Sequence, residues 1–519
     1  MMVPKWMNIA WCVQHWSELY PDKPAILYEE EEISYSNLAR RVERTVQWLR
    51  SLNIQKGDRV AVMVDNSPEF IELYLACSRL YAIFVPINVR LAGAELRYII
   101  ENSLPKLFIF GNRFAEDIAS LDLSELRPKL LLASIGKNSI PNDSLDYLTG
   151  TLAFEGVKTS PEDFAAFDPE DPQVIMYTSG TTGRPKGAVL PHRKTFFNCL
   201  NSWFYFEFNF KDIILVVLPL FHSGGLIIQA SPSLYYGGSM ILHAKFDPPQ
   251  VYRDIERYRV TKFLGVPTVY RELLRVDPDK MRDLSSLEAC GIGGEQTPPD
   301  LIMRCREMGF PMRQVMGQTE TSIFLWASEE DFLRKPGTVG RPVFHGEVGL
   351  MDERGQPVKP GEIGQLVVRG SIMMKEYWQD ADKTKENIRE GWLYTGDLAS
   401  MDAEGYFFLV DRAKDMYISG GENVYPAEVE RVLKEHPGVE DVAVVGVPDE
   451  RWGEAGQAFI IPRSGWDLHS DDILNHCEGR LARYKWPKAV IFKKEFPRGP
   501  MGKVQKTRLV EATTNHPED

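Results

Sequence analysis

Cysteine is scarce in this sequence, and none of it is arranged for a metal site or a disulfide framework. Six cysteines are scattered along 519 residues, without a Cys-x-x-Cys pair and without the spacing of a zinc site. Such usage is typical of a reducing compartment, where thiols stay free. We therefore expect six free thiols and a cytoplasmic protein.

An excess of positive charge is also missing. The formal net charge is −13 at pH 7, whereas general nucleic-acid binders and proteins of anionic membrane surfaces need a broad basic face. The sequence therefore argues against both classes, and an anionic ligand has to be met by local positive charge. Residues 480–508 carry ten basic residues and one acidic residue, although such a run is also typical of a solvated surface.

Long uninterrupted apolar runs are the third absence. Residues 1–20 mix charged side chains among apolar ones and do not resemble the core of a signal peptide. Residues 213–244 contain no Asp, Glu, Lys or Arg, but prolines and glycines interrupt them too often for a helix in lipid. We expect buried strand, loop and helix pieces there and no integral membrane span, and we leave peripheral membrane contact open.

Strand-like and helix-like segments alternate along the chain. The β-branched run 59–64 precedes a helical pattern over 69–80, and the same order recurs over 284–308. This alternation predicts an α/β fold with helices on both faces of parallel sheets. Beyond residue 350, short strands are punctuated by glycine. We predict a large N-terminal domain (1–412), with doubly wound mixed sheets and a small barrel-like subdomain, and a small mobile α+β C-terminal domain (415–519).

The most informative segment is residues 177–187, which read Y-T-S-G-T-T-G-R-P-K-G directly after an apolar run. Glycine lets backbone N–H groups approach an anion, hydroxyls add donors, and Lys186 adds charge, so the segment predicts a polyphosphate cradle. It is not a Walker A loop, because Lys186 precedes Gly187 instead of Ser or Thr. The alternative is a plain flexible linker. The residues that we expect to hold phosphate are Thr178, Ser179, Gly180, Thr181, Thr182, Gly183 and Lys186.

Seven motifs in order extend this interpretation. They are residues 177–187, 219–225, 317–320, 361–377, 394–397, 411–426 and 497–503. Together they resemble the adenylate-forming superfamily of acyl-CoA synthetases, luciferases and peptide-synthetase adenylation domains, and the resemblance covers nearly the whole chain. It implies two half-reactions: a carboxylic acid and MgATP give an acyl-adenylate and pyrophosphate, and a thiol then takes the acyl group.

The resemblance assigns the phosphate chemistry to three further residues. Lys503 is implied as the catalytic lysine, because attack on the α-phosphorus needs its negative charge neutralised; the alternative is one more surface lysine of the basic run. Glu320 and Thr178 are implied as the protein ligands of Mg²⁺, which takes few ligands from the protein, and Thr319 as a donor to the α-phosphate. Glu320 could instead stabilise a helix N-terminus.

The nucleoside is implied to lie between strand ends and a later strand pair. Asp397 would accept hydrogen bonds from the ribose hydroxyls, and Arg412 would reach the ribose or the phosphates; both are also plausible structural ion-pair partners. The remaining residues that match the nucleotide site are Gly293, Gly294, Glu295, Met316, Gly317 and Gln318. Met316 stands where the family often has tyrosine, which removes an aromatic neighbour of adenine.

The second half-reaction is implied to use a rotated C-terminal domain, with its hinge at Lys414. Residues that would then face coenzyme A are Ser419, Gly420, Gly421, Glu422, Arg483 and Lys485. Without the surrounding motif, a simple turn would explain Gly420 and Gly421.

The acyl pocket is implied to include Trp203, Phe204, His222, Gly224 and Gly317. Residues 203–210 are dense in aromatic side chains, which suit an apolar pocket. Their phenylalanines also recur with period two, so an ordinary half-buried strand explains the run equally well. We do not interpret His222 as a metal ligand, because no second histidine follows at metal spacing.

These observations predict an AMP-forming acyl-CoA synthetase for a fatty (medium- to long-chain) or aryl acid, with ATP and coenzyme A as co-substrates and Mg²⁺ as cofactor. The first alternative is an adenylating enzyme that loads a carrier protein, or one that oxidises its product as luciferases do. A remoter alternative is a nucleotide-binding protein without catalysis. Oligomeric state is left open between monomer and homodimer.

Overall fold

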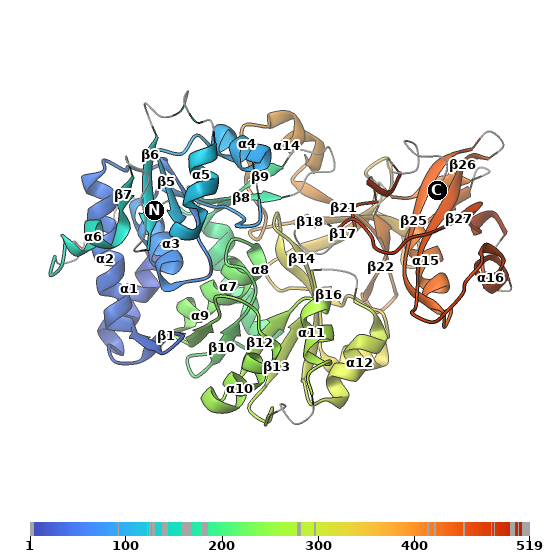
Figure 1. The fold of residues 1–519 in the computed structure, drawn as a ribbon, viewed down its shortest axis with the longest axis horizontal. Coiled ribbons are helices and arrows are strands. Elements are labelled where there is room, and N and C mark those ends of the chain that lie inside the picture. The colour runs from blue at the N-terminus through green and yellow to red at the C-terminus, as the bar shows by residue number, and fades with distance from the viewer. Residues whose placement is uncertain are drawn as a thin grey trace. The chain divides into compact units, whose positions relative to one another are not determined.

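The computed structural model divides into two compact units, which are described separately (Figure 1). Unit 1 comprises Met1–Val348 and Val368–Leu393, and unit 2 comprises Gly349–Val367 and Tyr394–Asp519. The residues that the structure describes are 5–91, 93–121, 123, 126, 130–136, 144–157, 168–178, 185–277, 282–294, 297–412, 415–419, 422–449, 452–478, 480–481, 483–498, 504–506 and 508–510.

Unit 1 contains a nine-stranded sheet in the order β16-β15-β14-β13-β12-β10-β11-β1-β2. Its strands are β1 (Pro24–Tyr28), β2 (Glu31–Ser34), β10 (Ile213–Val216), β11 (Ser239–Leu242), β12 (Lys262–Gly265), β13 (Ala289–Ile292), β14 (Met312–Gln318), β15 (Ser322–Ala327) and β16 (Arg341–Pro342). The strands from β1 to β14 in this order run parallel, and β2, β15 and β16 pair antiparallel at the two edges. The predicted parallel sheet is confirmed.

An eight-stranded sheet forms the other layer of unit 1, in the order β19-β9-β8-β4-β3-β5-β6-β7. Its strands are β3 (Arg59–Met63), β4 (Ile83–Pro86), β5 (Leu107–Gly111), β6 (Leu131–Ile135), β7 (Leu145–Asp146), β8 (Pro172–Thr178), β9 (Lys186–Pro191) and β19 (Glu376–Tyr377). Here too the interior is parallel, and β9 and β19 close one edge antiparallel.

The helices of unit 1 follow the strands as the alternation predicts. They are α1 (Ile9–Leu19), α2 (Tyr35–Ser51), α3 (Pro68–Leu80), α4 (Gly93–Ser103), α5 (Ala115–Ser120), α6 (Tyr147–Leu152), α7 (His192–Phe206), α8 (Ser223–Gly225), α9 (Ser231–Tyr236), α10 (Pro248–Tyr258), α11 (Pro267–Leu273), α12 (Pro299–Glu307), α13 (Glu329–Arg334) and α14 (Ala381–Asn387). Short helical turns add Lys5–Met7, Asn112–Phe114 and the π-helix Leu226–Ala230. In the described part of the chain, no helix combines the length and apolar character that a membrane crossing requires.

Helix α7 lies between the two sheets. It contacts β9 of the eight-stranded sheet and β13 and β15 of the nine-stranded sheet. It runs through Phe206 and ends at Glu207, whose φ of 55° is left-handed. The alternative of a strand beginning at Phe204 is therefore wrong. The alternation of phenylalanines suggested a strand, but the first half of the run 203–210 forms the last turn of α7.

The hydrophobic core of the eight-stranded sheet explains why its strands read as continuous apolar runs. Phe108, Phe110, Ile175 and Val189 are fully buried in one cluster with side chains of β3, β4, α4 and α5. Parallel strands covered on both faces lose the alternation of apolar and polar residues. This core holds β8 and β9 rigidly up to the point where the glycine-rich loop leaves them.

Two five-stranded sheets follow residue 346. A five-stranded sheet contains β17 (Glu347–Met351), β18 (Ile363–Arg369), β20 (Ile388–Arg389), β21 (Trp392–Met401) and β22 (Phe407–Arg412). A second five-stranded sheet in unit 2 contains β23 (Tyr417–Ser419), β24 (Glu422–Val424), β25 (Val439–Asp449), β26 (Gly453–Pro462) and β27 (Ala489–Phe492), with helices α15 (Pro426–Lys434) and α16 (Ser470–His476) and the turn Arg483–Lys485. The predicted boundary at 412–415 stays a prediction.

All six cysteines are free and buried, as expected from their spacing. The basic segment 480–508 is only partly available to a ligand. Lys485 pairs with Glu428, Arg498 with Asp441, and Lys506 with Glu430. Part of the local positive charge is therefore balanced by acids of the same unit.

Candidate active site

The first component of the candidate site is the hairpin of β8 and β9. Thr178 ends β8 and lies opposite Lys186, which begins β9. Gly187 follows Lys186 at a point of close packing, because a Cβ there would lie 2.8 Å from Cγ2 of Ile175. The hairpin thus anchors both ends of the loop to the buried core. The predicted residues Ser179, Gly180, Thr181, Thr182 and Gly183 lie outside the described residues.

The second component is the tight turn between β14 and β15. Gln318 lies opposite Ser322, and Thr321 closes the turn by accepting from the Gln318 N–H at 3.2 Å. Ser322 has a left-handed φ of 57°, which costs a residue other than glycine roughly 1 to 3 kcal/mol. A Cβ on Gly317 would lie 2.2 Å from the Ser322 carbonyl oxygen. The turn is therefore locked, and it carries Thr319, which is buried, and Glu320, which is half-buried.

Strand β19 ties the two hairpins together. The Tyr377 hydroxyl donates to Oε1 of Glu320 at 2.9 Å, and Nζ of Lys186 lies 5.3 Å from the centroid of the Tyr377 ring. The backbone continues the link, since the Met374 N–H donates to the Glu320 carbonyl at 2.6 Å and the Trp378 N–H to the Gly187 carbonyl at 2.7 Å. The structure thus brings two predicted residues, Lys186 and Glu320, to opposite sides of one tyrosine.

Burial and the neighbouring Glu320 raise the pKa of Tyr377 far above its ordinary value. The phenol therefore stays protonated and donates its hydrogen to the carboxylate. Sequence reasoning did not assign a role to Tyr377, although it is the last residue of the motif 361–377. Its contact with Glu320 crosses 57 residues of chain, and only the fold reveals it.

The carboxylate oxygen atoms of Glu320 suit a magnesium ion. In the described residues, Oε2 of Glu320 receives no hydrogen bond, so one carboxylate oxygen is available as a ligand. Across that same part of the chain, no cluster of three or more His, Cys, Asp or Glu could hold a metal by itself. A hard cation that takes one or two protein oxygens and completes its shell from phosphate and water fits such a site.

The ends of β13 and β14 lie side by side and form the predicted adenine side. Ile292 pairs with Gln314, and a Cβ on Gly293 would lie 2.1 Å from the Val315 carbonyl oxygen. Gly294 has a left-handed φ of 84°, and Met316 is buried. The structure therefore brings Gly293, Gly294, Met316, Gly317 and Gln318 to one edge of the sheet. Glu295 lies outside the described residues.

The predicted acyl residues Trp203 and Phe204 have different surroundings in the structure. Trp203 is 51% exposed and lines a cavity of about 410 Å³ together with aromatic side chains of α1, α9 and the loop after α7. Phe204 stacks instead on Phe344, with ring centroids 5.2 Å apart. His222 Nδ1 accepts from the Gly224 N–H at 3.3 Å, and neither residue lines that cavity. Consecutive helical residues point about 100° apart, which separates Trp203 from Phe204.

Unit 2 contains the predicted ribose residues. Asp397 lies opposite Arg412 on the antiparallel pair β21 and β22. Asp397 is buried, and its N–H donates to Thr395 Oγ1 at 3.1 Å, while that hydroxyl donates to the Leu366 carbonyl at 2.8 Å. The backbone register thus makes the two predicted residues neighbours. Lys414 and Lys503 lie outside the described residues.

The predicted coenzyme A residues differ in availability. Ser419 is buried and lies opposite Glu422 on β24, and Gly420 and Gly421 are outside the described residues. The Lys485 ammonium contacts both carboxylate oxygens of Glu428 at 2.7 Å. Arg483 is exposed, and its guanidinium lies 3.9 Å from the Trp486 ring centroid. Of these two cations, Arg483 is the more accessible to an anion.

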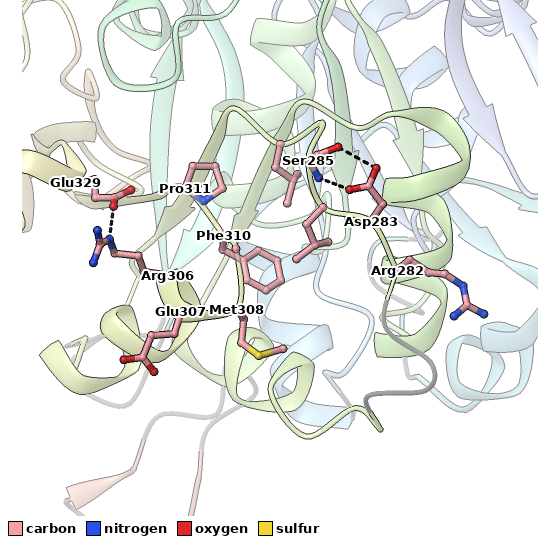
Figure 2. Close-up of a pocket in the computed structure, with 12 residues that line it drawn as sticks. Arg282, Asp283, Ser285, Arg306, Glu307, Met308, Phe310, Pro311 and Glu329 are labelled. Carbon is pink, nitrogen blue, oxygen red and sulfur yellow. Dashed lines mark hydrogen bonds and ion pairs between the residues drawn. The ribbon is translucent and has the colours of Figure 1, made fainter.

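A larger surface pocket of about 710 Å³ contains none of these residues. Figure 2 shows Arg306 reaching to Glu329 and Asp283 bonded to Ser285 at its two sides. Its residues Phe310 and Pro311 precede β14 and Leu287 precedes β13. Doubly wound sheets bind ligands at the carboxyl ends of their strands. This pocket lies at the opposite edge and does not belong to the candidate site.

Comparison with known proteins agrees with this geometry. The family model of the AMP-binding enzymes matches residues 13–378, and that of the AMP-binding enzyme C-terminal domain matches residues 428–503. A feruloyl-CoA synthase of an Amycolatopsis species is 38% identical over 96% of this chain and 97% of its own length. An indoleacetate–CoA ligase of Aromatoleum aromaticum has the same identity and the same coverage. The crystal structure of ATP-bound MatB from Rhodopseudomonas palustris matches with a TM-score of 0.87 and 30% identity, over 98% of this chain and 99% of that one.

The similarity is sequence-wide and covers both predicted domains of the chain. The resemblance that the seven motifs indicated is confirmed, and so is the mixed α/β fold class. Relatives named for acids of different kinds share the transfer of an acyl group to coenzyme A. The chain belongs to the AMP-binding enzyme family, and it is an AMP-forming acyl-CoA synthetase with ATP and coenzyme A as co-substrates.

Proposed function

We propose that this enzyme activates an aryl carboxylic acid as its acyl-adenylate and then transfers the acyl group to coenzyme A. The observation that carries the proposal is the convergence of the β8–β9 and β14–β15 hairpins on Tyr377, whose ring lies near Lys186 and whose hydroxyl bonds Glu320. A cation and a carboxylate at the ends of two parallel sheets suit a nucleoside triphosphate with its magnesium ion. The aryl class is supported by the two relatives at 38% identity, whose names give feruloyl and indoleacetate substrates.

In the first half-reaction, Lys186 attracts the β- and γ-phosphates, and Thr319 donates to the α-phosphate. Glu320 and Thr178 would hold magnesium, which neutralises charge on the phosphates when it is bound. Asp397 accepts from the ribose hydroxyls, and Arg412 is a second contact of the ribose or phosphates. Lys503 stabilises the transition state of carboxylate attack on the α-phosphorus, as pyrophosphate leaves.

In the second half-reaction, the C-terminal domain rotates about Lys414 and brings Ser419, Gly420, Gly421 and Glu422 to the active centre. The thiol of coenzyme A then attacks the acyl carbonyl, and AMP leaves. Arg483 is the preferred phosphate contact for coenzyme A, because Lys485 is already paired with Glu428. Lys503 is not needed in this half.

The first experiment separates the two half-reactions. Lys503→Ala is expected to lower acyl-dependent pyrophosphate release by at least ~100-fold, in the range found when one transition-state donor is removed. The same variant should convert a preformed acyl-adenylate and coenzyme A into acyl-CoA at nearly the wild-type rate. An equal loss in both halves would contradict the assignment of Lys503 to adenylation alone.

The second experiment identifies the acid and the acceptor. Mass spectrometry would follow products formed from ATP, a panel of aryl, straight-chain and dicarboxylic acids, and either coenzyme A or a holo carrier protein. We expect aryl-CoA thioesters with the highest kcat/KM. Preference for medium- or long-chain fatty acids would overturn the substrate proposal and leave the reaction class intact. Carrier loading without acyl-CoA would overturn the acceptor.

A further inference from the structure

A buried lysine that the proposed mechanism does not use lies behind the β14–β15 turn. Lys194 is the third residue of α7, and its side chain is fully buried. Two features make a cation unfavourable there: removal from water, and the positive end of the helix dipole. A lysine in this position therefore needs a compensating partner, and its neighbours identify that partner.

The hydrogen-bond partner of Lys194 is Ser322. Within the described residues, the Lys194 ammonium donates to one acceptor, the Ser322 hydroxyl. Ser322 is the residue of the turn that carries the left-handed φ of 57° and packs against Gly317. Lys194 thus holds the side chain of the strained residue that closes the turn carrying Glu320. The contact joins residues 128 apart in the chain.

The Glu320 carboxylate attracts the Lys194 ammonium without a direct ion pair in the described residues. Burial lowers the pKa of Lys194 to about 7, Glu320 acts in the opposite direction, and Arg193 adds to the lowering. On its other side, Glu320 is fixed by the Tyr377 hydroxyl and by the Met374 N–H. Tyr377 therefore fixes the carboxylate of Glu320 directly, and Lys194 fixes the turn that carries Glu320 through Ser322.

We propose that Lys194 is a positioning residue for Glu320: through its hydrogen bond to Ser322 it fixes the turn that carries Glu320 and so keeps the carboxylate directed at the metal of the bound nucleotide. The inference rests on the proposed role of Glu320 as a magnesium ligand. Groups that orient a metal ligand from behind typically change metal affinity 10- to 100-fold when they are removed. A lysine that only fills space in the core would change stability without changing metal binding.

The test measures metal binding directly. Mn²⁺ is titrated into the enzyme–ATP complex, and free Mn²⁺ is followed by electron paramagnetic resonance. Lys194→Met keeps the length of the side chain and removes its charge and donors, and we expect Mn²⁺ binding to weaken by about 10-fold. The half-saturating Mg²⁺ concentration for pyrophosphate release should rise by a similar factor, with the KM for the acid within about twofold of wild type.

Two controls separate positioning from simple stability. Lys262 is an equally buried lysine at the start of β12, paired with Asp212 and Glu288, and Lys262→Met should lower the thermal midpoint while Mn²⁺ binding stays unchanged. If Lys194→Met does not fold, Ser322→Gly keeps Lys194, tolerates the left-handed φ and removes the hydroxyl link. We expect Ser322→Gly to weaken Mn²⁺ binding by about threefold, a loss comparable to one modest hydrogen bond.

A double variant decides whether Lys194 acts through Glu320. In the background of Glu320→Gln, adding Lys194→Met should produce no further loss of Mn²⁺ affinity. Full additivity, or a Lys194→Met protein with wild-type Mn²⁺ binding, would overturn the inference while leaving the enzyme's reaction untouched. If Glu320→Gln itself binds Mn²⁺ normally, the proposed role of Glu320 fails first. The two failures are therefore distinguishable.

Discussion

The two hairpins of the candidate site support opposite charges by different means. The hairpin of β8 and β9 carries Lys186 directly after a glycine-rich stretch of seven residues, whereas the hairpin of β14 and β15 carries Glu320 on a turn of three residues. The long side chain of lysine can adjust its position to follow a phosphate. Magnesium tolerates little deviation in the geometry of its ligands. The difference teaches that the metal-side residue is positioned by a tight backbone turn, whereas the phosphate-side residue can adjust through its long side chain.

The largest expected effect comes from removing the charge on the rigid hairpin. Glu320→Gln keeps the shape of the side chain and should lower kcat/KM for acyl-dependent pyrophosphate release by about 100-fold or more, because a charged group aimed at the phosphates is lost. Steady-state kinetics at varied Mg²⁺ measures it. Glu329→Gln, which affects only the surface pair with Arg306, is the matched control and should stay within twofold. A small effect of Glu320→Gln on kcat/KM would contradict the assignment of the metal-side role to the β14–β15 hairpin.

The next effect tests the rigidity itself. Gly317→Ala places a methyl group 2.2 Å from a backbone oxygen of Ser322, whereas Gly187→Ala places one 2.8 Å from the end of the Ile175 side chain. Backbone yields less than a side chain, so we expect a destabilisation of about 2 to 3 kcal/mol for Gly317→Ala and about 1 kcal/mol for Gly187→Ala. Urea midpoints compare the two. Equal losses would mean that the hairpins are equally rigid.

Lys186→Met tests the contribution of the β8–β9 hairpin to ATP binding. We expect the KM for ATP to rise by about 10-fold, which corresponds to the loss of one charge-assisted hydrogen bond, with a smaller change in kcat. The measurement is pyrophosphate release at varied ATP and saturating acid. A fall in kcat with an unchanged KM would place Lys186 in the transition state instead and would make the two hairpins alike.

The smallest expected effect concerns the link between the hairpins. Tyr377→Phe removes the hydroxyl that donates to Glu320 and keeps the ring beside Lys186. We expect a roughly fivefold loss in kcat/KM, close to the value of a single hydrogen bond of about 1 kcal/mol, and an unchanged KM for ATP. If the KM for ATP rises by the same factor as kcat/KM falls, the Tyr377 hydroxyl also supports ATP binding by Lys186, and the prediction is wrong.

Much of the fold and part of the site follow from local sequence pattern. The helix predicted over 69–80 is Pro68–Leu80, and the one opened by Pro298 is Pro299–Glu307, because the apolar period and the proline that opens each helix act locally. The same holds for the strand end before Thr178. Ordered motifs then identified the family without any knowledge of the packing.

The remainder depends on contacts between distant residues. Tyr377 meets Glu320 across 57 residues and Lys194 meets Ser322 across 128, and no local pattern announces such pairs. The strand interpretation of the aromatic run at 203–210 was wrong for a related reason. Trp203 and Phe204 belong to a helix that lies between two sheets, so neighbours in sequence face different surroundings.

The burial of the six cysteines has a practical consequence for following domain motion. Burial raises the pKa of the Cys12 thiol to about 12 and of Cys477 to about 11, and the other four thiols shift in the same direction. Reagents attack the thiolate, which these sites hardly form. A single cysteine introduced on each unit would therefore accept a fluorophore while the native thiols stay silent. The native thiols would therefore give an unreactive background for a test of the proposed rotation of the C-terminal domain.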